Sequence, residues 1–78
     1  SNGREVDAIL DFGDKLMPIE IKSGQTINRD FFTGLEHWLS LAGDKAFSPA
    51  LIYGGTQNQN RKGIRILGWD QAKQALPE

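Results

Sequence analysis

Two segments of alternating residues on either side of Gly13-Asp14 constrain the fold of this chain more than any other feature. Apolar residues occupy every second position from Val6 to Phe12, and the alternation returns between Lys15 and Ser23. This period of two predicts β-strands with one apolar face. A two-residue loop that begins with glycine suits a tight hairpin turn. The segments are therefore expected to form an antiparallel hairpin, in which Pro18 favours an edge position or an irregular start of the ladder.

The loop also fixes the register of the predicted hairpin. If Phe12 pairs with Lys15, each residue of the apolar face meets an apolar partner, which supports this pairing. Side chains repeat every two residues, so the residues between them face the other side of the sheet. The apolar pairs are Val6–Ile21, Ala8–Ile19 and Leu10–Met17.

The same register places Asp7 opposite Glu20, and Glu5 opposite Lys22, on the second face. Two opposed carboxylates repel each other, so another charge must offset the repulsion. A divalent cation between the carboxylates would do so, as would, in part, the ammonium group of Lys22. Mg²⁺ usually binds one or two carboxylates together with water and phosphate oxygens. The alternative is a solvated sheet face with cross-strand ion pairs such as Glu5–Lys22, and the pattern leaves both interpretations open.

The remainder of the chain predicts a helix, two further strands and a short final helix. Asn28 is suited to begin the first helix and Gly43 to end it. Asp70 is suited to cap the final helix. The predicted class is α/β (α+β), with the order strand, strand, helix, strand, strand, helix and one helix packed on a mixed sheet. The predicted ranges are 49–53 for the third strand, 56–63 for a polar loop, 64–69 for the last strand and 70–76 for the final helix.

The hairpin carries a motif with a family resemblance. Asp7 followed by Glu20-Ile21-Lys22 resembles the PD-(D/E)xK signature of restriction-endonuclease-like nucleases, and its place on a hairpin resembles that in archaeal Holliday junction resolvases. The strings Gly-Arg-Glu-Val-Asp (3–7) and Pro-Ile-Glu-Ile-Lys-Ser-Gly (18–24) resemble the C-terminal domain of unknown function of bacterial and archaeal AAA-type ATPases. The resemblance covers residues 3 to about 69, and it implies a fragment of a restriction-endonuclease-like core.

The resemblance also implies an activity and the residues that carry it. Asp7, Glu20 and Lys22 would be catalytic, with Asp7 and Glu20 as ligands of Mg²⁺ or Mn²⁺ and Glu5 as a further ligand. The reaction would be metal-dependent phosphodiester hydrolysis of DNA or RNA, with an ATPase portion of the parent chain N-terminal to this domain. The alternative is a non-catalytic nucleic-acid-binding or structural module of such an ATPase that retains the nuclease fold.

Contacts with nucleic acid are expected at two places, Lys22-Ser23 and Arg61-Lys62. Ser23 is equally consistent with an ordinary residue at a strand end. For Arg61 and Lys62 the pattern favours the alternative, a solvated hairpin loop. The formal net charge is −1, which is not the basic balance of a dedicated nucleic-acid binder. A bound cation or another part of the protein would have to supply much of the positive field.

The chain is interpreted as one piece of a longer protein. Residues 1–2 are typical of an expression scar, and residues 3–78 are expected to form a single nuclease-like domain, the C-terminal part of that protein. The absence of cysteine and of any membrane-length apolar stretch favours a cytoplasmic protein without membrane contact. Since the family's helix and strand before residue 3 are missing, an unpaired strand edge and an uncovered apolar face are expected. A homodimer of the fragment would cover both.

Overall fold

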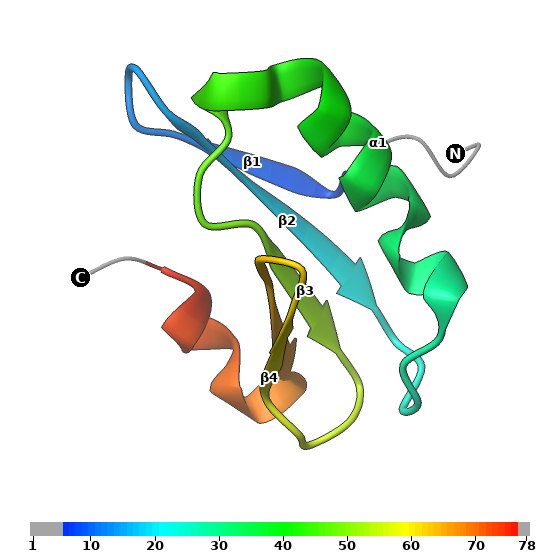
Figure 1. Cartoon of the computed structure of the whole chain (residues 1–78). Helices are drawn as coiled ribbons and strands as arrows, with labels where there is room; N and C mark the ends of the chain where they lie inside the picture. Colours follow the sequence, from blue (N-terminus) through cyan, green and yellow to red (C-terminus); the bar gives the residue numbers. More distant parts are fainter. Residues whose placement is uncertain (1–5, 77–78) are drawn as a thin grey trace.

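The computed structural model describes residues 6–76 as a mixed α/β fold built on one five-stranded sheet (Figure 1). The strands are β1 (Ala8–Asp11), β2 (Leu16–Lys22), β3 (Ala50–Tyr53), β4 (Gln59–Arg61) and β5 (Ile64–Gly68). The helix is α1 (Thr33–Ala42), and three 3-10 helices accompany it in these residues: η1 (Arg29–Phe32), η2 (Gly43–Lys45) and η3 (Trp69–Ala75).

The sheet has the order β1-β2-β3-β5-β4. β2, β3 and β5 run parallel to one another, and β1 and β4 pair antiparallel at the two edges. The predicted mixed sheet is therefore present. The parallel connection from β2 to β3 runs through α1, which is the usual way to join parallel strands.

The hairpin of β1 and β2 has the predicted register. Ala8 pairs with Ile19 and Leu10 with Met17. The turn is closed by the Phe12 amide, which donates a hydrogen bond of 2.9 Å to the Lys15 carbonyl. Gly13 takes the first loop position with a φ of +92°, a conformation that favours glycine.

Pro18 lies inside the sheet rather than at its edge, so the edge expectation is wrong. β2 is flanked by β1 and β3, and its ladder with β3 begins only at Ile19. On the other side Pro18 faces Ile9. In an antiparallel ladder, hydrogen-bonded and non-hydrogen-bonded pairs alternate. Counted from the hydrogen-bonded pair Phe12–Lys15, the pair Ile9–Pro18 is non-hydrogen-bonded, so it requires no amide from Pro18. The irregular start on the β3 side is what accommodates the proline.

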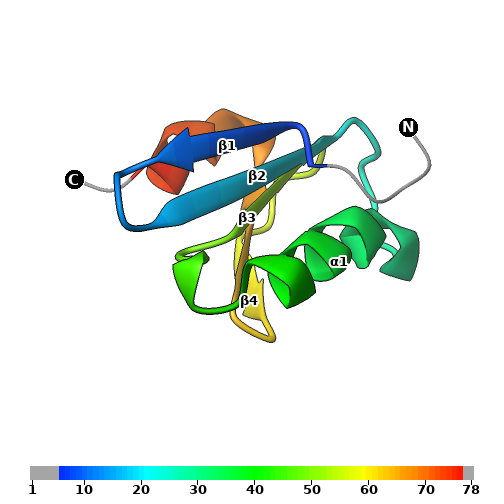
Figure 2. The same cartoon turned by 90° about the horizontal axis from the view of Figure 1, so that it is seen from above.

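α1 and η3 lie on opposite faces of the sheet (Figure 2). One apolar cluster lies under each of them. Part of the apolar face of the hairpin is covered: Met17 and Ile19 are buried in a cluster with Ala75 of η3, while Phe12 and Ile21 are each 45% exposed. The η3-side cluster contains Met17, Ile19, Ala50, Ile52, Leu67 and Ala75. The α1-side cluster contains Phe32, Leu35, Leu51, Tyr53, Ile64 and Ile66.

The first helical segment begins and ends where the sequence predicts. The Asn28 side chain accepts a hydrogen bond of 2.9 Å from the Asp30 amide, and η1 forms the first turn before α1. Gly43 follows the helix with a φ of +57°. With ten residues α1 is too short to cross a membrane, and no other helix in the described part of the chain is long and apolar enough to do so.

The C-terminal third departs from the predicted ranges. Gln59–Arg61 forms the edge strand β4, where a polar loop was predicted. Trp69 begins η3 instead of ending the last strand. Gly68, not Asp70, occupies the cap position of η3, and no side chain caps it. Pairing with β5 supplies the tertiary contact that turns the short polar segment into a strand.

Arg65 of β5 ties this C-terminal segment to the sheet. Its guanidinium group donates hydrogen bonds to the carbonyl oxygens of Ser48 (2.7 Å), Ala75 (2.9 Å) and Gln74 (3.0 Å). Burial lowers the pKa of Arg65. The end of η3 and the loop before β3 therefore share one cationic side chain.

Candidate active site

The hairpin brings the carboxyl groups of Asp7 and Glu20 together. Asp7 lies just before β1, and the register that pairs Ala8 with Ile19 places it opposite Glu20. This position lacks backbone hydrogen bonds between the strands, so its side chains approach closely. Protonated Glu20 donates a hydrogen bond to the Asp7 carboxylate, which shifts the pKa of both groups. The two acids therefore act as one coupled pair.

Asp7 also explains why β1 begins at Ala8. Its Oδ2 atom accepts a hydrogen bond of 2.7 Å from the Ile21 amide. In a longer ladder that amide would pair with the Val6 carbonyl. The side chain replaces the backbone acceptor, and Val6 packs against the α1-side cluster. The predicted Val6–Ile21 apolar pair is therefore wrong, and Ile21 is 45% exposed.

Burial sets the proton affinity of Glu20, whose side chain is 4% exposed. Burial raises the pKa of Glu20 to about 7, with further contributions from the hydrogen bond and the negative charge of Asp7, and in spite of the positive charge of Lys22. The hydrogen bond from Glu20 is the largest cause that holds the pKa of Asp7 below its usual value. Near neutral pH the pair thus holds one proton that is poised to leave, which suits acid–base chemistry or cation binding.

Lys22 completes the group of charged side chains on this face. It follows Glu20 by two residues in β2, so both side chains point to the α1 side of the sheet. Its charge lowers the pKa of both Asp7 and Glu20, and its side chain is partly exposed. An acid pair with a neighbouring ammonium group can hold a divalent cation and a phosphate oxygen side by side.

The predicted metal ligands are only partly within view. Glu5 lies outside the described residues, as does the predicted expression scar. Within 6–76 no group of three or more His, Cys, Asp and Glu residues is placed to hold a metal ion. Asp7 and Glu20 nevertheless provide the one or two carboxylates that Mg²⁺ needs when water and phosphate oxygens complete its shell.

A mainly apolar pocket of about 340 Å³ adjoins Lys22 and Ser23. It lies where β2, β3 and β5 end, and Gly54 and Trp69 line its other sides. Trp69 is 63% exposed. The sequence analysis did not select this residue as a site candidate, because it assigned Trp69 to the end of the last strand.

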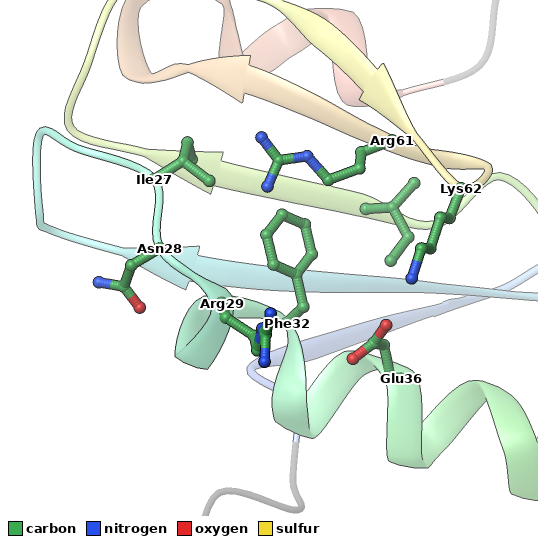
Figure 3. Close-up of a pocket in the computed structure, with 8 residues that line it drawn as sticks. Ile27, Asn28, Arg29, Phe32, Glu36, Arg61 and Lys62 are labelled. Carbon is green, nitrogen blue, oxygen red and sulfur yellow. The ribbon is translucent and has the colours of Figure 1, made fainter.

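The other predicted nucleic-acid contacts line a different pocket, of about 390 Å³. There Arg61 and Lys62 extend from β4 and its turn toward the helical segment (Figure 3). The Arg61 guanidinium lies 5.3 Å from the centre of the Phe32 ring. Arg29 joins the two cations, although the sequence analysis did not select it. The four predicted contact residues are therefore divided between two pockets.

Replacing Glu20 by glutamine is expected to stabilise the protein at alkaline pH. The pKa of Glu20 is about 7 in the folded chain and 4.5 in the unfolded chain. Its protonated form therefore stabilises the fold fully below pH 4.5, and this stabilisation is lost as the pH rises from 4.5 to about 7. Glutamine mimics the protonated acid, so at pH 8 the free energy of unfolding of the variant should exceed that of the wild type by about 1–2 kcal/mol. This figure is reduced from the full pKa shift because Asp7 is exposed and solvent screens its charge. Urea unfolding at pH 4.5 and pH 8 measures this difference.

The matched control for this variant is Glu36→Gln, which removes the same charge from an exposed position of α1. Its free energy of unfolding should stay within about 0.5 kcal/mol of the wild type at both pH values. A stabilisation by Glu20→Gln that is equal at both pH values would contradict the buried-proton account.

The chain matches a known family model. A family model described as a domain of unknown function, DUF4143, matches residues 1–71. This range contains both strings that resemble the C-terminal domain of AAA-type ATPases. No curated protein and no solved structure matches the chain.

Proposed function

The chain belongs to the DUF4143 family of domains of unknown function, and we propose that it is a metal-dependent nuclease domain with a restriction-endonuclease-like core. Its reaction is hydrolysis of a phosphodiester bond in DNA or RNA. The site consists of Asp7, Glu20 and Lys22. In the parent protein the domain works beside an N-terminal AAA-type ATPase portion.

One observation carries this proposal: a buried glutamate faces an aspartate across a hairpin, with a lysine on the same face. Burying an acid beside a second acid destabilises a small sheet, and a purely structural position could use an apolar residue instead. A ligand that binds the ionised pair would offset this cost and account for the two acids. Mg²⁺ or Mn²⁺ fits, because both cations favour carboxylate oxygens.

Each residue has a definite task in the proposed reaction. Asp7 and Glu20 would hold the cation, and the hydrogen bond from the Ile21 amide fixes the orientation of the Asp7 carboxylate. A bound cation supplies an activated water and neutralises charge on the phosphate. Lys22 stabilises the negative charge that grows on the phosphate oxygens and helps to position the water. Since the pKa of Glu20 is about 7, cation binding releases a proton and strengthens as the pH rises through 7.

Cleavage of labelled oligonucleotides tests the function directly. Single-stranded and duplex DNA and RNA are incubated with the chain in Mg²⁺, in Mn²⁺ and in EDTA. We expect shorter products only where a divalent cation is present, with Asp7→Asn as the inactive comparison. Binding without cleavage in every condition would replace the nuclease proposal with the non-catalytic module.

Cation binding gives a second readout of the same site. Mn²⁺ at ten times its dissociation constant should stabilise the fold by about 1.4 kcal/mol, because it binds the folded hairpin and not the unfolded chain. For a domain of this size the melting temperature should rise by roughly 5–10 °C. Asp7→Asn should abolish the rise. An equal rise in the variant would show that the cation binds elsewhere.

A further inference from the structure

Three depressions on the surface of the described residues share lining residues. The pocket beside Lys22 shares Gly54 with a second depression of about 520 Å³, which in turn shares Ile27 with the cationic pocket. The middle depression is polar and uncharged, and it includes the side chains of Gln57 and Gln59. The three depressions follow one another from the end of β2 to the β4 edge of the sheet, and this row of depressions is called the groove below.

One end of the groove is strongly positive for a chain with a formal net charge of −1. Arg29, Arg61 and Lys62 line it, and Glu36 is its one acidic lining residue within 6–76. The Arg61 guanidinium lies over the Phe32 ring, 5.3 Å from its centre, and this cation–π contact favours one position of the guanidinium. A fixed guanidinium can donate two parallel hydrogen bonds to a phosphate group, which an ammonium group cannot do.

The turn between β4 and β5 is built to present these cations. Lys62 has a φ of +54° and therefore sits in the left-handed conformation of a tight turn. The Gly63 amide donates a hydrogen bond of 3.1 Å to Oδ1 of Asn60, which closes this turn. Arg61 and Lys62 consequently project from a constrained segment, so less freedom is lost when they bind a ligand.

The opposite end of the groove offers a surface for a base. Trp69 is 63% exposed and lines the apolar pocket beside Lys22. An exposed indole can stack on the face of an unpaired base, whereas a base within a duplex is covered by its neighbours. A positive groove with an aromatic platform is the usual combination in proteins that bind single strands.

We propose that this groove binds a single strand of nucleic acid, with a phosphate held by Arg29, Arg61 and Lys62 and a base stacked on Trp69. The inference rests on the proposed nuclease function, since it supplies the substrate for that site.

Matching positions on neighbouring strands of the sheet are occupied by Glu20, Leu51, Ile66 and Gln59. Three interstrand steps from Glu20 to Gln59 span roughly 14 Å, and Arg61 of the cationic pocket follows Gln59 by two residues in β4, so this pocket holds a different phosphate from the one that reacts.

Binding of a fluorescent twelve-residue oligothymidylate, measured by anisotropy in EDTA over a range of KCl concentrations, tests the groove apart from cleavage. The variant is Arg61→Gln with Lys62→Gln. Its control is Lys45→Gln with Lys73→Gln, an equal charge change at exposed positions of η2 and η3. We expect the groove variant to bind about tenfold more weakly, with a salt slope smaller by about 1.4 for two lost phosphate contacts, and the control to stay within twofold.

Other outcomes would overturn the inference. An equal loss in both double variants would mean that overall charge, not the groove, governs binding. No binding by the wild type would show that the groove does not bind a single strand. Equal affinity for a duplex of the same length would overturn the single-strand assignment. Because Arg61→Gln also removes the stacking on Phe32, Arg29→Gln serves as a second variant that leaves that contact intact. Each result is independent of cleavage, so the nuclease proposal can fail or stand separately.

Discussion

Replacing Leu35 by alanine is expected to lower the free energy of unfolding by about 2–5 kcal/mol. Leu35 is completely buried, and it belongs to the cluster that joins α1 to the sheet. The change removes apolar contact and leaves a cavity that the surrounding side chains fill only in part. A domain of 78 residues has a small reserve of stability, so much of it would be lost. Urea unfolding followed by circular dichroism measures the loss.

Leu41→Ala is the matched control, since Leu41 lies on the same helix and is 75% exposed. The same chemical change there should alter the free energy of unfolding by no more than about 0.5 kcal/mol. Similar effects at the two positions would mean that α1 does not pack on the sheet through Leu35.

The second large effect is expected at Lys22. Lys22→Met should reduce metal-dependent cleavage by about 10²–10³-fold, because the charge that stabilises the phosphate in the transition state is lost. Methionine keeps the length and the apolar stem of the side chain, so the melting temperature should change little. Single-turnover cleavage of the best oligonucleotide substrate measures the rate.

Lys45→Met removes the same charge from an exposed position in η2 and should leave the cleavage rate unchanged. If Lys22→Met cleaves at the rate of the wild type, the lysine has no role in the reaction. If both variants slow cleavage equally, the effect reflects the net charge of the chain and not the site.

The local parts of this fold could be predicted from the sequence because neighbouring residues determine them. The glycine at position 13 and the alternation around it fix the hairpin and its register. Asn28 and Gly43 mark the ends of the helical segment through their own backbone and side-chain preferences. From that register followed the juxtaposition of Asp7 and Glu20, which lie thirteen residues apart in the chain.

The features that the sequence did not predict depend on tertiary contacts. β4 contains Gln59, Asn60 and Arg61, which have no apolar alternation, and it is a strand because β5 lies beside it. Val6 departs from the hairpin because the Asp7 carboxylate, and not the Val6 carbonyl, accepts the hydrogen bond from the Ile21 amide. A pattern of residue types does not show which group accepts a given backbone hydrogen bond.

The same division applies to the candidate sites. The acid pair and Lys22 occupy one short motif, so they could be recognised together. The cationic pocket combines Arg29 at the start of a helix with Arg61 and Lys62 from a distant turn. The α1-side cluster, in which Phe32 packs with Ile64, and the position of Arg61 over the Phe32 ring bring these segments together.

Arg65 has a consequence for the way the domain opens. Its three carbonyl acceptors belong to two segments that are far apart in the chain, the loop before β3 and the end of η3. If η3 detached alone, the partly buried guanidinium would keep its charge and lose two of these acceptors. Fraying of the C-terminal segment is therefore coupled to the central sheet, and the two behave as one cooperative unit during local unfolding.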